Sequence, residues 1–188
     1  MNLPNKLTVL RMALVPVFVA LLMLPVIPHN SLWALVVFAA ASLTDLLDGK
    51  IARKRGLVTD FGKLMDPLAD KVLVAAAYIC LIELGDLSSI AVLIVIAREF
   101  AVTSLRLVAA GRGQVLAADI WGKAKTVSQM VTVIGILLLR ELTFAGVLPA
   151  AFPYGAVVTA AVWITVALTL FSGCNYFWVN RKIFQGQL

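Results

Sequence analysis

The sequence is poor in charged residues, from which soluble domains build their surfaces. Charged side chains make up 14% of the 188 residues, hydrophobic residues make up 62%, and the mean hydropathy is +0.99. Because a soluble domain is roughly a quarter charged, this composition excludes an ordinary soluble domain and predicts an integral membrane protein. The net charge of +6 fits cytoplasmic loops and anionic headgroups. No compact basic domain is present outside the membrane, so nucleic acid is not an expected partner.

Cysteine and histidine are also scarce. Cys80 and Cys174 lie in separate apolar runs, and His29 is the only histidine. The sequence has no C-x-x-C and no Cys/His cluster, so both cysteines are predicted to be small buried hydrophobes. The first apolar run is not followed by a small-residue cleavage site, which favours a retained span over a signal peptide.

Long apolar runs are what the sequence has in abundance. A helix needs about 20 residues to cross the hydrocarbon of a bilayer, and lysine and arginine gather in alternate connectors between the runs. The positive-inside rule then places both termini in the cytoplasm. We predict an all-α integral membrane protein, a single domain over residues 1–188 with six transmembrane helices. The predicted spans are Leu7–Leu24, Leu32–Leu47, Val72–Leu84, Ile90–Val108, Thr126–Leu139 and Ala156–Tyr176, the third running in from Pro67.

Acidic residues gather where the second and third spans meet the cytoplasm. Asp45 and Asp48 are three positions apart, and Asp66 and Asp70 are four apart, so each pair shares a face if its helix continues. Asp60 lies between the pairs and is predicted to be solvated. The sequence therefore predicts two helix ends, each presenting two carboxylates.

Four neighbouring carboxylates repel one another and need a counter-charge. Oxygen ligands of this kind suit Mg²⁺ or Mn²⁺, and two such ions can hold a phosphate. Three small residues leave room for a ligand: Gly49, Ala52 and Gly62. Arg53 can pair with a phosphate of that ligand. A loop that joins the two helix ends is predicted to hold Arg53 and Gly62. An alternative that spacing leaves open is a set of surface ion pairs between these aspartates and Lys50, Arg53 and Lys71.

The full pattern resembles the signature of the CDP-alcohol phosphatidyltransferase family. It reads Asp45-x2-Asp48-Gly49-x2-Ala52-Arg53-x8-Gly62-x3-Asp66-x3-Asp70. The resemblance implies six transmembrane helices, a homodimer, two Mg²⁺ or Mn²⁺ ions, and displacement of CMP from a CDP-linked lipid by an alcohol. It implies metal binding by the four signature aspartates and a general base at Asp70. It also implies nucleotide and diphosphate contacts from Gly49, Ala52, Arg53 and Gly62, and from Asn5 and Thr8 in the "PNKLT" element.

Residues 97–126 bear on the identity of the acceptor. The segment "AREFAVTSLRLVAAGRGQVLAADIWGKAKT" offers cations that suit a phosphorylated acceptor: Arg106, Arg112, Lys123 and Lys125. Its "REF" and "GKAKT" elements resemble bacterial family members that make phosphatidylglycerophosphate, which implies CDP-diacylglycerol and sn-glycerol 3-phosphate as substrates. Arg98 and Glu99 fall in an apolar run, where a lone charge is costly, so we expect them to be paired or functional. Asp119 has no role that the sequence supplies.

Other interpretations stay open at this point. The cations also fit plain positive-inside topology, and the acceptor may differ among family members: phosphatidylglycerol, inositol phosphate or serine. A cation-coupled transporter is a more distant alternative. It is disfavoured because the acids gather at one cytoplasmic edge, whereas transporter sites lie near mid-membrane.

Overall fold

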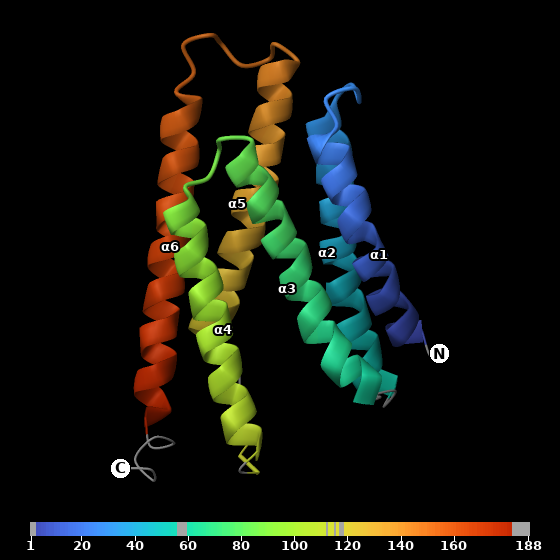
Figure 1. Cartoon of the computed structure of the whole chain (residues 1–188), viewed down its shortest axis with the longest axis vertical. Helices are drawn as coiled ribbons and strands as arrows, with labels where there is room; N and C mark the ends of the chain where they lie inside the picture. The colour runs from blue at the N-terminus through green and yellow to red at the C-terminus, as the bar shows by residue number, and fades with distance from the viewer. Residues whose placement is uncertain (1–2, 56–59, 112, 115, 117–118, 182–188) are drawn as a thin grey trace. The chain divides into compact units, whose positions relative to one another are not determined.

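The protein is helical throughout the part of the chain that its computed structural model describes (Figure 1). This part comprises residues 3–55, 60–111, 113–114, 116 and 119–181, and at positions 3–4, 45–55, 60–64, 66–67 and 70 it includes the backbone alone. The helices are α1 (Leu3–Met23), α2 (Asn30–Arg55), α3 (Asp60–Glu83), α4 (Ser89–Gly111), α5 (Ile120–Phe144) and α6 (Tyr154–Val179).

Each predicted span falls on one of these helices, and the largest differences are at the helix ends. α3 begins at Asp60, ahead of the start expected at Pro67. α2 continues to Arg55, so the predicted loop holding Arg53 and Gly62 is wrong, because both positions lie in helices. Lysine and arginine are good helix formers. A helix can therefore continue past the end of its apolar run, where hydropathy places the end of the span.

The helices form two compact units. Unit 1 comprises Met1–Leu84 and Val133–Phe152, which include α1, α2, α3 and the C-terminal part of α5. α1 contacts both α2 and α3, and the rings of Phe18 and Phe38 lie 5.8 Å apart at this contact. Ala34, Ala41 and Ala77 are fully buried, which allows the helix backbones to approach closely, as in other membrane helix bundles.

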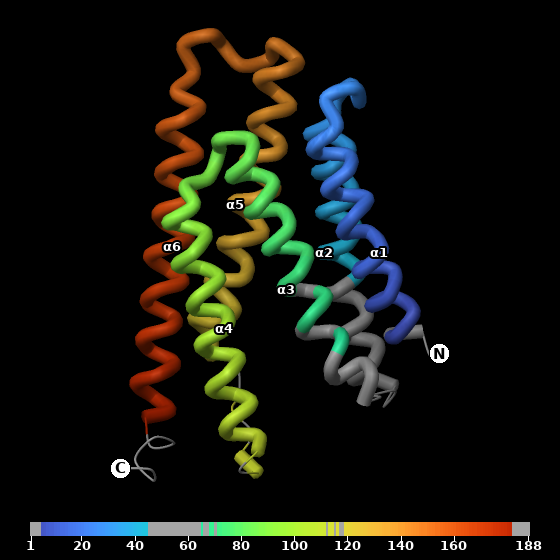
Figure 2. The backbone as a smooth tube through the Cα atoms, viewed as in Figure 1, coloured from blue at the N-terminus to red at the C-terminus, as the bar shows by residue number. Residues whose placement is uncertain are grey.

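Unit 2 comprises Gly85–Thr132 and Pro153–Leu188, and contains α4, the N-terminal part of α5, and α6. α4 and α6 lie side by side (Figure 2). On α5 and α6, the Thr165 hydroxyl lies 2.6 Å from that of Ser128 and 2.8 Å from that of Thr132. Hydrogen bonds of this kind join helices in an apolar medium, where an unpaired hydroxyl is costly.

The surface of the helices is that of a membrane protein. Among the described residues, three helical segments are long and apolar enough to cross a bilayer: Asn5–Met23, Ile120–Phe144 and Tyr154–Val179. Asn30–Thr44 is a shorter apolar segment. Large apolar side chains are widely exposed, with Leu93 at 66%, Leu107 at 68% and Ile164 at 61%. Contiguous apolar surface of this extent marks a membrane or partner interface, and the membrane prediction is confirmed at this level.

Candidate functional site

The backbone places the signature aspartates on two continuous helices. Asp45 and Asp48 lie in α2, and Asp66 and Asp70 lie in α3. Their spacings of three and four put each pair on one face of its helix, and α2 contacts α3. The structure describes the backbone at these four positions but not the side chains. The same holds for the other signature positions, Gly49, Ala52, Arg53 and Gly62, whose backbones are helical.

α1 contributes a polar surface at the same end of unit 1. Figure 1 shows the start of α1, the end of α2 and the start of α3 together at that end. One stripe along α1 is buried, polar in its first half and apolar in its second: Asn5, Thr8, Arg11, Val15, Phe18 and Leu22. Asn5 is 7% exposed and Thr8 is fully buried, so the two predicted nucleotide contacts are on the inner side of α1.

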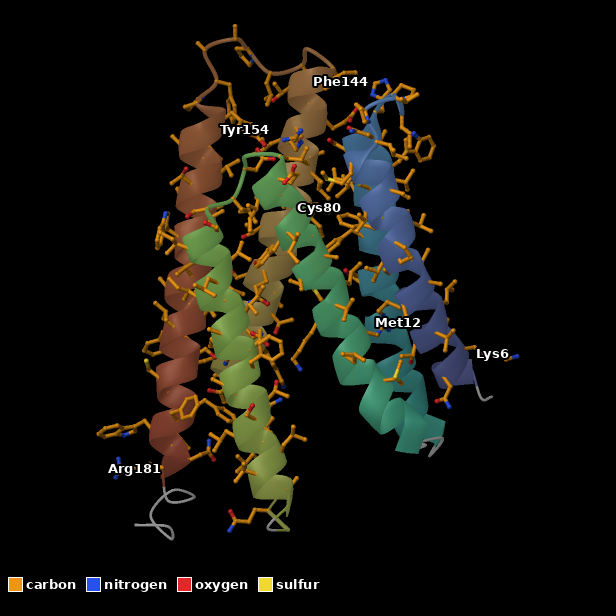
Figure 3. All side chains as sticks on the ribbon, viewed as in Figure 1. Lys6, Met12, Cys80, Phe144, Tyr154 and Arg181 are labelled. Atoms are coloured by element: carbon orange, nitrogen blue, oxygen red, sulfur yellow. The ribbon has the colours of Figure 1, made fainter. Side chains whose placement is uncertain are left out.

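Arg11 belongs to this stripe and was missed as a site candidate by the sequence analysis. It is 1% exposed, whereas Lys6 on the same helix is exposed and points away from the helices in Figure 3. A buried cation is retained only with compensating polar groups. The signal was its spacing of three from Thr8, which in turn lies three from Asn5.

The donor set on α2 and α3 fits divalent cations. Two carboxylate pairs on contacting helices would supply hard oxygen ligands without sulfur or imidazole, the ligand type that suits Mg²⁺ and Mn²⁺. Among the side chains that the structure does describe, no group of three His, Cys, Asp or Glu residues is placed to hold a metal. The fit therefore rests on the four signature aspartates.

Arg98 and Glu99 are paired, as expected for charges in an apolar run. Arg98 donates from Nη2 to the Ser172 hydroxyl at 2.7 Å, and its Nη1 lies 3.3 Å from Glu99 Oε1. Lys125 of α5 forms an ion pair with the same Glu99 oxygen. Gly173 allows the close approach of Arg98, because a Cβ at this position would lie 3.0 Å from Arg98 Cγ. Glu99 thus joins α4 to α5, and Arg98 joins α4 to α6.

We expect Glu99→Gln to destabilise unit 2. The variant leaves Arg98 and Lys125, whose side chains are each 8% exposed, without the carboxylate between them. Breaking a buried ion pair costs several kcal/mol, and Glu99 is a fifth exposed, so the free energy of unfolding should fall by about 2–3 kcal/mol. Unfolding of the purified protein in detergent measures this. The control is Glu83→Gln at an exposed carboxylate, and equal losses in both variants would contradict the assignment.

The four acceptor-phosphate candidates differ in their surroundings. Arg106 is exposed and donates from Nε to the Tyr176 hydroxyl at 3.0 Å. Lys123 is exposed, Lys125 is 6% exposed and paired with Glu99 as described above, and Arg112 lies outside the described residues. Of these four candidates, the three that the structure describes belong to unit 2, whereas the signature aspartates belong to unit 1.

Asp119, to which the sequence analysis gave no role, directly precedes α5. Its Oδ1 accepts from the Gly122 backbone N–H at 2.8 Å, and its Oδ2 accepts from the Asn175 side-chain amide at 3.0 Å. The first contact is a helix N-cap, which satisfies a backbone donor that has no partner within the helix. An aspartate directly before a helical segment was a signal for this role, but the partner on α6 had none.

His29 has structural contacts in unit 1. Its Nδ1 pairs with Glu141, and its ring meets that of Phe144 edge-on at 5.2 Å. Figure 3 labels Phe144 at the end of α5. His29 also has a φ of 54°, an uncommon conformation for a residue other than glycine.

The fold and the candidate site define a class of protein: a membrane-embedded helical enzyme with paired carboxylates on two helix ends. The sequence model for CDP-alcohol phosphatidyltransferases matches residues 1–171, and the chain belongs to that family. It is 44% identical over 190 residues to the CDP-diacylglycerol–glycerol-3-phosphate 3-phosphatidyltransferase of Bacillus subtilis, covering 95% of each chain. Proteins of the same name from Rickettsia bellii and Pseudomonas fluorescens are 38% and 37% identical, with 97% and 93% of their chains covered. The family prediction is confirmed.

Proposed function

We infer that this protein transfers the phosphatidyl group of CDP-diacylglycerol to sn-glycerol 3-phosphate, giving phosphatidylglycerophosphate and CMP. The observation that carries the inference is 44% identity, across 95% of both chains, to a relative named for that reaction. In this chain, the segment 97–126 carries cations suited to a phosphorylated acceptor. The reaction is a step of phospholipid biosynthesis, so its product is a lipid of the same membrane.

The metal site is proposed at the helix ends of unit 1. Asp45, Asp48, Asp66 and Asp70 would hold two Mg²⁺ or Mn²⁺ ions, which when bound would neutralise charge on the diphosphate and on the departing CMP. Residues proposed to bind the CDP-linked lipid are Asn5, Thr8, Gly49, Ala52, Arg53 and Gly62. Their support is the signature spacing, the inward-facing stripe of α1, and the donor chemistry of the four aspartates.

The chemistry is a displacement at phosphorus. A hydroxyl of the acceptor attacks the phosphorus that bears diacylglycerol, and a new bond forms between that phosphorus and the acceptor oxygen. The bond to the bridging oxygen breaks, and CMP leaves with the electron pair. The Asp70 carboxylate accepts the proton of the attacking hydroxyl. The candidates for binding the acceptor phosphate are Arg106, Arg112, Lys123 and Lys125.

The substrates also suggest where the reaction takes place. One keeps its acyl chains in the bilayer, and the other arrives from water, so the site belongs at an interface. We propose six membrane spans with both termini and the active site at the cytoplasmic face of the plasma membrane, and a homodimer. The distribution of lysine and arginine among the connectors supports this orientation.

The acceptor is tested by measuring CMP release from CDP-diacylglycerol by the purified protein. We expect sn-glycerol 3-phosphate to give the highest kcat/KM when compared with phosphatidylglycerol, inositol phosphate and serine. A phosphate-binding group of cations discriminates against serine, because serine has no phosphate to pair with the positive charges of that group. Equal or better turnover with inositol phosphate or serine would overturn the choice of acceptor, and no turnover with any alcohol would overturn the enzyme class.

A further inference from the structure

Two of the candidate acceptor-binding cations, Lys125 and Arg106, have partners that differ in charge. Lys125 is 6% exposed and pairs with the Glu99 carboxylate, which compensates its charge in part because Arg98 shares the same oxygen. Arg106 is exposed and bonds to the hydroxyl of Tyr176, a neutral group. An anion approaching from water therefore meets an intact positive charge at Arg106 but a compensated one at Lys125.

Tyr176 is held rigidly by its surroundings. It is 2% exposed and packs in a cluster with Val102, Leu105 and Ala109 of α4. A buried aromatic ring packed against an adjacent helix has little rotational freedom. The position of its hydroxyl is thus determined by the α4–α6 contact.

The contact between the two side chains leaves part of the guanidinium available. Arg106 Nε donates to the Tyr176 hydroxyl at 3.0 Å, and Arg106 Cζ lies 5.2 Å from the centroid of the same ring. A guanidinium has five N–H donors in a planar fork. When Nε is used, the two terminal nitrogens remain as a pair that matches two oxygens of a phosphate.

We propose that Tyr176 is a positioning residue that orients Arg106 to bind the phosphate of the acceptor, and that Lys125 is a structural partner of Glu99. The assignment rests on the proposed function, because it takes sn-glycerol 3-phosphate as the acceptor. It distinguishes Arg106, which binds the substrate anion, from Lys125, which holds α4 to α5.

Tyr176→Phe tests the proposal, because it removes only the hydroxyl and keeps the ring in its cluster. The KM for sn-glycerol 3-phosphate should rise on the order of tenfold, since a hydrogen bond to a charged group is lost. The kcat and the KM for CDP-diacylglycerol should stay within about twofold. The Arg106→Lys background keeps the positive charge but has no guanidinium and therefore no Nε donor. In this background, Tyr176→Phe should have no further effect on the KM for sn-glycerol 3-phosphate.

Tyr154→Phe is the matched control on the same helix. The Tyr154 hydroxyl donates to Asp86 at 2.7 Å. Tyr154 begins α6, whereas Tyr176 lies near the other end of that helix. Figure 3 labels Tyr154 at the start of α6 and Arg181 just past its end. This variant also loses a tyrosine hydroxyl that is bonded to a charged group, but it leaves the Arg106 contact intact. We expect its KM for sn-glycerol 3-phosphate to be unchanged and its thermal unfolding temperature to fall at least as much as that of Tyr176→Phe.

Binding of sn-glycerol 3-phosphate in the absence of CDP-diacylglycerol separates this proposal from the proposed reaction. Weaker binding by Tyr176→Phe supports the positioning role even if the wild-type protein releases no CMP, an outcome that would overturn only the proposed reaction. Normal wild-type turnover with an unchanged KM in Tyr176→Phe overturns the positioning role alone. Equal effects of Tyr176→Phe in the wild-type and Arg106→Lys backgrounds also overturn it, as does a wild-type protein that fails to bind the anion.

Discussion

Asp70→Asn is expected to abolish CMP release while leaving CDP-diacylglycerol bound. Asparagine has nearly the same shape as aspartate but cannot accept the proton of the attacking hydroxyl. General base catalysis contributes roughly 10²–10⁴-fold, so kcat should fall by about 10³-fold or more when CMP release is measured. Binding of CDP-diacylglycerol to the purified variant, followed by calorimetry, should remain detectable because three of the four signature aspartates are intact.

Asp60→Asn is the control for this experiment. Asp60 begins α3, lies outside the family signature, and loses the same charge in the substitution. Its kcat should stay within about twofold of wild type, since the sequence predicts a solvated side chain at this position and substitutions of that kind have small effects. Turnover retained by Asp70→Asn would contradict the assigned base, and equal losses in both variants would point to a general charge effect at this end of the helices.

Removal of divalent cations is the second change with a large expected effect. Treatment with EDTA should reduce CMP release to background, and Mg²⁺ or Mn²⁺ should restore it, because four adjacent carboxylates and a diphosphate repel one another without counter-charge. Asp66→Asn should raise the metal concentration needed for half-maximal activity by more than about tenfold, the scale on which changes around a metal alter its affinity. The measurement is CMP release across a titration of each metal.

The same titration distinguishes the metal site from the alternative of surface ion pairs. Asp60→Asn should show the wild-type metal requirement, because it removes a charge near the site without removing a proposed ligand. Full activity after EDTA treatment would favour ion pairs between the aspartates and neighbouring lysine and arginine residues. An unchanged metal requirement in Asp66→Asn would remove that residue from the proposed ligand set.

The positions of the helices were predictable because apolar runs of bilayer length leave few alternatives. The ends of α2 and α3 were not, since hydropathy marks the boundary of the hydrocarbon but not the last hydrogen-bonded turn of a helix. Arg53 and Gly62 were therefore assigned to a loop, whereas both lie in helices. The difference affects the candidate site directly, because the structure puts these two proposed phosphate-binding positions on the same helices as the aspartates.

Within the candidate site, local spacing was informative and long-range pairing was not. The carboxylate pairs are three and four positions apart, a separation that helix geometry alone interprets. The partners of Arg106 and Asp119 lie 70 and 56 positions away on α6, and their contacts depend on how α6 packs. A charge in an apolar run, as at Arg98 and Glu99, predicts that a partner exists without identifying it.

Neither compact unit is a continuous stretch of the chain. Unit 1 ends at Leu84 and resumes at Val133, and unit 2 is interrupted by the same second segment of unit 1. During synthesis, His29 therefore emerges well before Glu141, its partner in unit 1, and the segment from Gly85 to Thr132 must be made between them. Unit 1 can therefore be completed only after α4 and the start of α5 have been made, so neither unit is complete before part of the other exists.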